Sequence, residues 1–172
     1  MKRLILLLLS LFLLIGSLGC GSNEENLKKP AKFYYLNKEV DYGVEDGLIS
    51  YELQETEDIG NDLLKLLTQY KQGPISHHLI NVLSPDINIT SVEKQGSVIT
   101  VSTDTSFAHI SGIDRTIACS CISMTLLDYT GAEYIEIHII DEFLGEKESL
   151  IFSRQDMYLL DINSIPTENN TQ

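Results

Sequence analysis

The sequence predicts a single α+β domain in which two helices pack on one face of a mixed or antiparallel sheet. Three observations predict it. Short stretches alternate apolar and polar side chains, which is typical of half-buried strands. Two longer stretches repeat apolar residues every three or four positions, which is typical of helices. Their order along the chain is strand, strand, helix, hairpin, helix, strand, and such an order favours helices on one face of a sheet.

The first two strands are expected at 32–36 (KFYYL) and 47–55 (GLISYELQE). In the second stretch, three apolar side chains alternate with three polar ones from Ile49 onward. The period then changes, and a helix is expected over 57–72. Its apolar stripe consists of Ile59, Leu63, Leu66, Leu67 and Tyr70. Gly73 followed by Pro74 supplies the helix stop.

The next stretch, 87–103, predicts a hairpin whose turn uses Gly96 at positive φ. A second helix is expected over 113–128. With helix geometry extended backward, its core stripe would contain Ile110, Ile113, Ile117, Cys121 and Met124. The strand EYIEIHII at 133–140 follows, with three isoleucines on one side, and the later runs SLIF and MYLLDI are candidate edge strands.

The N-terminus has the layout of an export signal. Lys2 and Arg3 precede an apolar run of about 12 residues, which is short of the roughly 20 needed to cross a bilayer. Small residues and then Cys20 follow, as in bacterial lipoproteins, where this cysteine is acylated. A diacylated cysteine holds a protein stably at a membrane. The sequence therefore predicts a lipid anchor at Cys20 on the extracytoplasmic face of the cell membrane.

These features divide the chain into four parts. We expect a signal peptide at 1–19, a lipidated tether at 20–31, a globular domain at 32–163 and a flexible tail at 164–172. The tether and the tail are both polar.

The charge balance limits the partners. The chain has a formal charge of −13, and loss of residues 1–19 removes two basic residues and no acidic ones, which leaves −15. Such a surface repels nucleic acid and anionic lipid headgroups, so the acyl chains must hold the protein at the membrane. The sequence contains no nucleotide-binding, zinc-protease or EF-hand motif, and we predict no cofactor and no metal site.

The second predicted helix contains two cysteines. Cys119 and Cys121 are rotated by about 200° from each other on a helix, so their sulfur atoms cannot form a disulfide or share one metal ion. Cys121 falls on the core stripe, whereas Cys119, Ile122 and Leu126 form a second apolar face. A helix that is apolar on two faces is either enclosed or presents a partner surface. We consider these three residues a possible interface, with a second buried layer as the alternative.

Other polar residues are interpreted as loop residues. His77 and His78 are adjacent, and no nearby side chains complete a metal set. Asp104, Ser106 and His109 are residue types of a hydrolase triad, but the serine lies in no G-x-S-x-G motif. We therefore predict no catalytic residues.

Several landmarks together resemble the GerMN domain of sporulation and spore-germination lipoproteins. They are the stretches FYYL, LLKLLTQYKQGP, LINVLSPDINITSVEKQGSVITVSTDTSF and EYIEIHI, between residues 33 and 140. The resemblance implies a non-enzymatic, membrane-tethered, extracytoplasmic module, which in some members is linked to sporulation and germination assemblies.

The leading hypothesis is therefore a lipid-anchored interaction module that contacts envelope or spore-assembly proteins. A small-ligand-binding lipoprotein is the main alternative, and an envelope hydrolase is the third. A concave apolar pocket with convergent polar groups would favour the second hypothesis over the first.

Overall fold

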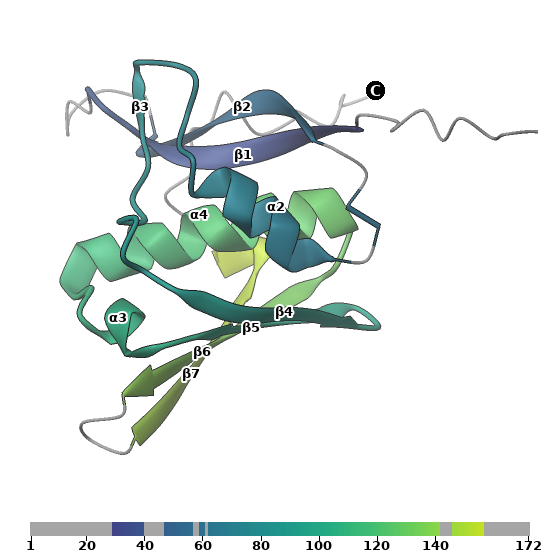
Figure 1. The fold of residues 1–172 in the computed structure, drawn as a ribbon, viewed down its shortest axis with the longest axis vertical. Helices are drawn as coiled ribbons and strands as arrows, with labels where there is room; N and C mark the ends of the chain where they lie inside the picture. Colours follow the sequence, from purple (N-terminus) through teal and green to yellow (C-terminus); the bar gives the residue numbers. More distant parts are fainter. Residues whose placement is uncertain (1–28, 40–46, 57–58, 61, 142–145, 157–172) are drawn as a thin grey trace, which may run out of the picture.

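The computed structural model describes residues 29–39, 47–56, 59–60, 62–141 and 146–156. Its fold is α+β, as predicted (Figure 1). In chain order the elements are β1 (Lys29–Asn37), β2 (Ile49–Thr56), α2 (Leu63–Tyr70), β3 (Leu79–Ile80), β4 (Ile89–Gln95), β5 (Val98–Thr103), α3 (Thr105–Ala108), α4 (Gly112–Thr130), β6 (Tyr134–Asp141), β7 (Glu146–Ser153) and the 3-10 helix η1 (Arg154–Asp156).

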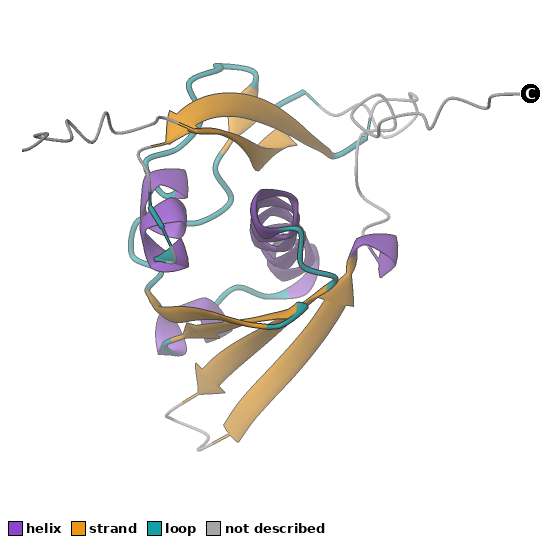
Figure 2. Ribbon diagram, turned by 90° about the vertical axis from the view of Figure 1, so that its right-hand side faces the viewer, coloured by secondary structure: helices purple, strands orange, loops and turns teal. Residues whose placement is uncertain are grey.

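The strands form two sheets. The three-stranded sheet has the order β2-β1-β3 and is antiparallel throughout. The four-stranded sheet has the order β4-β5-β6-β7 and is mixed, because β5 and β6 run parallel while the outer pairs are antiparallel. Figure 2 shows α4 and α2 between the two sheets. The helices therefore have strands on two sides, where the sequence predicted one sheet on one side.

The central helix α4 explains this arrangement. Every residue from Ile117 to Leu127 is buried, so the helix has no face on solvent over three turns. On the three-stranded side, the Oγ1 of Thr125 accepts the backbone N–H of Tyr34 at 3.1 Å. Strand β3 pairs with β1 only at Leu36 and Asn37. The bond to Thr125 therefore satisfies a backbone donor of β1 that lies beyond this pairing.

The helix boundaries differ from the expected ones. The helix expected at 57–72 is shorter, because Gly60 has a left-handed φ of 54° and Asp62 has a non-helical ψ of 76°. Its predicted apolar stripe is nevertheless buried. In the longer helix, Ile113 is 58% exposed and Ile110 precedes the first turn, so the predicted stripe is wrong at these two positions. The helix ends at Gly131, whose φ of 67° allows its N–H to reach the Leu127 carbonyl at 2.9 Å.

Most strand predictions are confirmed. Gly96 has a φ of 61° in the β4–β5 turn, and the three isoleucines of β6 point into the core. The SLIF run lies within β7, at the edge of its sheet. β1 begins at Lys29, three residues inside the expected tether, and it buries Ala31. The remainder of the tether, the signal peptide, the tail and the MYLLDI run lie outside the described residues.

Candidate functional site

The three residues considered as an interface lie inside the protein. Cys119, Ile122 and Leu126 have no exposed surface. The second apolar face of α4 is enclosed between the sheets, which is the alternative that the sequence left open. The expectation that these side chains meet a partner is therefore corrected: in this fold they contribute to the core.

Both cysteines are thiols of low reactivity in the folded protein. Cys119 and Cys121 are free and buried. Burial raises the pKa of each thiol to about 12, so almost no thiolate forms near neutral pH. The phenol of Tyr70 is also buried, and it interacts with the Cys121 thiol. These groups have the character of core residues.

The loop residues have local roles. The carboxylate of Asp104 accepts the backbone N–H of Ser106 at 2.9 Å at the start of α3. The hydroxyl of Ser106 donates to the same carboxylate, which lowers the pKa of Asp104. That hydroxyl also accepts the Asn88 N–H at 2.9 Å. The Asp104 and Ser106 side chains thus join the start of α3 to the segment before β4, and His109 is exposed.

The adjacent histidines are exposed as well. The rings of His77 and His78 lie 3.9 Å apart, centroid to centroid, in the segment before β3. No group of three or more histidine, cysteine, aspartate or glutamate side chains is arranged to hold a metal ion within the described ranges. Within the same ranges, no helix is both long and apolar enough to cross a membrane.

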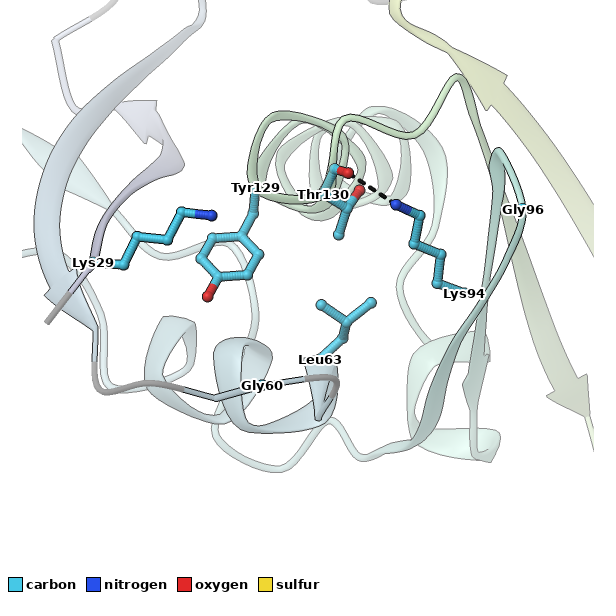
Figure 3. Close-up of a pocket in the computed structure, with 7 residues that line it drawn as sticks. All are labelled: Lys29, Gly60, Leu63, Lys94, Gly96, Tyr129 and Thr130. Atoms are coloured by element: carbon cyan, nitrogen blue, oxygen red, sulfur yellow. Dashed lines mark hydrogen bonds between the residues drawn. The ribbon is translucent and has the colours of Figure 1, made fainter. Parts of the chain in front are cut away.

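A cavity of about 550 Å³ lies at the C-terminal end of α4 (Figure 3). Four separate segments line it, namely the start of β1, the segment before α2, the β4–β5 hairpin and the last turn of α4. The lining residues are Lys29, Gly60, Leu63, Lys94, Gly96, Tyr129 and Thr130. Its volume falls within the range of small-molecule pockets.

Two lysines enter this cavity from opposite sides (Figure 3). The ammonium group of Lys29 lies 4.5 Å from the ring centroid of Tyr129, in a cation–π contact. The ammonium group of Lys94 donates to the carbonyl of Thr130 at 2.9 Å. That carbonyl is one of the last in α4, so Lys94 places positive charge at the negative end of the helix dipole.

Within the described part of the chain, neither of these lysines forms an ion pair with a carboxylate, and Lys71 also forms none, whereas several other cations are paired. Four of the others form ion pairs with carboxylates: Lys32 and Arg154 with Asp128, Lys65 with Asp62, and Arg115 with Glu148. Two lysines thus line the cavity, and no carboxylate of the described residues is among its lining side chains.

A second surface feature is the outer face of the four-stranded sheet, opposite the helices (Figure 2). Tyr134 on β6 is 45% exposed and Ile151 on β7 is 67% exposed. The strand register makes them diagonal neighbours, with Val98 of β5 directly beside Tyr134. We call Val98, Tyr134 and Ile151 the outer-sheet patch.

Sequence reasoning missed both features. Lys29 and Lys94 are far apart in the chain, and no motif contains them. The alternation around 133–140 did place Tyr134 on the side opposite the core, but Ile151 joined it only through the β6–β7 register.

No protein-family model matches the sequence, and no curated protein sequence matches it. Among solved structures, the chain is similar to the tandem GerMN domains of the sporulation protein GerM from Bacillus subtilis, with a TM-score of 0.52 and 17% identity. The match covers 70% of this chain and 42% of that one, so the chain spans less than half of the tandem structure. A Clostridium perfringens protein named as a lipoprotein matches with a TM-score of 0.44 and 17% identity over 84% of this chain and 99% of that chain. The fold is therefore GerMN-like.

Proposed function

We propose that this chain is a lipid-anchored, extracytoplasmic interaction module that binds another protein during envelope or spore assembly. The lipobox-like stretch before Cys20 supports the anchor, and the GerMN-like fold, shared with a sporulation protein, supports the setting. The observation that carries the interaction role is the outer-sheet patch, where a sheet covered by helices on one face leaves large apolar side chains exposed on the other.

The patch has the properties of a small contact site. Large exposed apolar side chains that adjoin one another mark interaction surfaces more often than scattered single ones do. Tyrosine is enriched at interfaces because it combines apolar area with a polar tip. Around the patch the face is polar, so a partner would find an apolar centre with a polar rim.

Charge indicates the kind of partner. In the register, Glu93, Thr100, Glu136 and Ile151 form one row across the outer face. Glu136 contacts His138 at 2.8 Å and accepts the Ser149 hydroxyl at 2.5 Å, so its carboxylate is held in place. With two carboxylates in the row that contains Ile151 and a formal charge of −15 after loss of residues 1–19, the face suits a partner with basic residues around an apolar contact.

Site-specific photo-crosslinking tests this role. A photoreactive phenylalanine analogue replaces Tyr134 in cells of the native host, and the same analogue replaces Ile75 as the control. Ile75 is 81% exposed but lies in the segment between α2 and β3. We expect a discrete crosslinked product from position 134 and none from position 75. Equal patterns at the two positions would refute the proposed surface.

The anchor is tested separately. We expect Cys20→Ala to move the protein from the membrane fraction to the soluble fraction, and mass spectrometry of the wild-type N-terminus to show an acylated cysteine. An unmodified thiol at that position would contradict the anchor. The ligand-binding alternative is favoured by one observation, the cavity between Lys29 and Lys94.

A further inference from the structure

We propose that the cavity at the end of α4 binds a phosphate ester, held between Lys29 and Lys94. The candidate sources are a phospholipid headgroup and a soluble phosphate ester, which present the same chemistry to the two lysines.

The N–H donors of Lys29 and Lys94 support an anion as the ligand of the cavity. Each lysine ammonium group has three N–H donors. Lys94 uses one on the Thr130 carbonyl, and Lys29 faces the Tyr129 ring. Neither ammonium group forms an ion pair with a carboxylate of the described residues, and each has more N–H donors than the contacts given for it use.

The arrangement of the charges favours phosphate over carboxylate. A carboxylate is planar and pairs best with the fork of an arginine, whereas lysine acts as a point charge. Lys29 and Lys94 approach from opposite sides (Figure 3). A tetrahedral anion has oxygens on several sides, so it suits donors that approach from different directions. Leu63 and the Tyr129 ring add apolar wall for the organic part of the ester.

The same lysines have a simpler structural effect, because positive charge at a helix C-terminus is stabilising. One ammonium group is enough for that purpose, and Lys94 already bonds the Thr130 carbonyl. Lys29 has no hydrogen bond to the helix end among the described contacts and lies over the Tyr129 ring instead. A second cation at the same end gives the cavity charge beyond that needed for the helix.

The acidity of the chain does not oppose binding at this place. At physiological salt, charges farther apart than about 8 Å are largely screened. Lys29 and Lys94 are the charged side chains among the residues that line the cavity, so they act on a phosphate inside it at the shortest range.

The position of the cavity brings a lipid headgroup within reach, an argument that rests on the proposed anchor at Cys20. Lys29 is the first described residue, and residues 21–28 join it to Cys20. These eight residues span at most about 28 Å when fully extended. An anchored chain would thus hold the cavity within about that distance of the membrane surface.

Lysine acetylation footprinting of the purified full-length mature protein tests the proposal. In the first arm, the protein in neutral detergent is acetylated with and without glycerol 3-phosphate. In the second arm, it is reconstituted into phosphatidylcholine vesicles with or without phosphatidylglycerol. Mass spectrometry reports the rate of acetylation at each lysine, and Lys65, which pairs with Asp62 and is not among the lining residues of the cavity, is the internal control.

We expect acetylation of Lys29 and Lys94 to slow by about tenfold, as for a charge-assisted contact, while Lys65 is unchanged. Saturable protection by glycerol 3-phosphate identifies a soluble ester. Protection only in vesicles with phosphatidylglycerol identifies a lipid headgroup. No protection in either arm, or equal protection of Lys65, would overturn the proposal.

A variant adds an independent check. Lys94→Gln should abolish the protection of Lys29, because the two lysines share one anion, whereas Lys65→Gln should leave it intact. Protection of Lys29 that persists in Lys94→Gln would contradict a shared site. The acetylation experiment on the wild-type protein does not depend on this variant. It therefore still tests the proposal if Lys94→Gln misfolds. The footprinting experiment involves no protein partner. Its result therefore does not depend on whether the outer-sheet patch binds one.

Discussion

Replacing Asp128 with alanine should destabilise the domain, because this carboxylate joins the first and last described elements. Asp128 lies in the last turns of α4, and its side chain is 14% exposed. It accepts the Tyr34 hydroxyl of β1 at 2.5 Å and pairs with Arg154 of η1. The Lys32 ammonium group lies 3.7 Å away.

The size of the effect follows from exposure. The hydroxyl bond to a charged acceptor contributes about 1.5–3 kcal/mol, and its loss removes the carboxylate acceptor of the Tyr34 hydroxyl in a largely buried site. The side chain of Arg154 is 53% exposed and that of Lys32 is 32% exposed, so screening limits each ion pair to about 0–1 kcal/mol. We therefore expect Asp128→Ala to lower the free energy of unfolding by roughly 2–4 kcal/mol.

Urea denaturation of the full-length protein, followed by circular dichroism, measures this change. Asp128→Asn is the matched control, because it keeps an acceptor of similar shape and should cost less. A double-mutant cycle with Tyr34→Phe should give a coupling of at least about 1 kcal/mol. A loss below about 1 kcal/mol in Asp128→Ala, or additive single and double variants, would refute the role assigned to this carboxylate.

Three further predictions concern the core and the hairpin. Cys119 and Cys121 should not react with a thiol reagent at pH 8 until urea unfolds the protein, because burial raises both pKa values to about 12; fast labelling of the native state would contradict their burial. For the same reason the unfolded chain releases these protons first, so the free energy of unfolding should fall as pH rises from about 9 toward 12, by about 1.4 kcal/mol per pH unit for each thiol. Urea melts should show a shallower fall in Cys119→Ala, and an unchanged slope would count against this explanation. Gly96→Ala should cost about 1–2 kcal/mol because alanine is strained at a φ of 61°, whereas Ser97→Ala next to it should cost little in the same denaturation assay.

The sequence predicted those elements whose pattern is local. Alternation located β2 and β6, and Gly96 located the hairpin turn, because these features depend on neighbouring residues. β3 was missed because it has only two residues and exists through pairing with Leu36 and Asn37. A pairing between distant segments leaves no local period.

The helix α4 shows a second limit. Its two apolar faces were visible in the sequence, but periodicity reports which side chains are apolar and not what covers them. Cys119, Ile122 and Leu126 are fully buried, and α4 lies between two sheets. The lysine cavity was invisible for a similar reason, because four segments must come together to form it.

The enclosed position of α4 also affects the order in which the protein can fold during synthesis. The strands β1 to β5 leave the ribosome before α4 is complete, and both sheets need this helix to cover their inner faces. Until residue 130 has been made, α2 can pack on β1 through Tyr70 and Tyr35, but the larger cover that α4 gives to both sheets is missing. The nascent chain would therefore stay open and exposed to chaperones and proteases for most of its length, and it would close late, when β6 and β7 follow the helix.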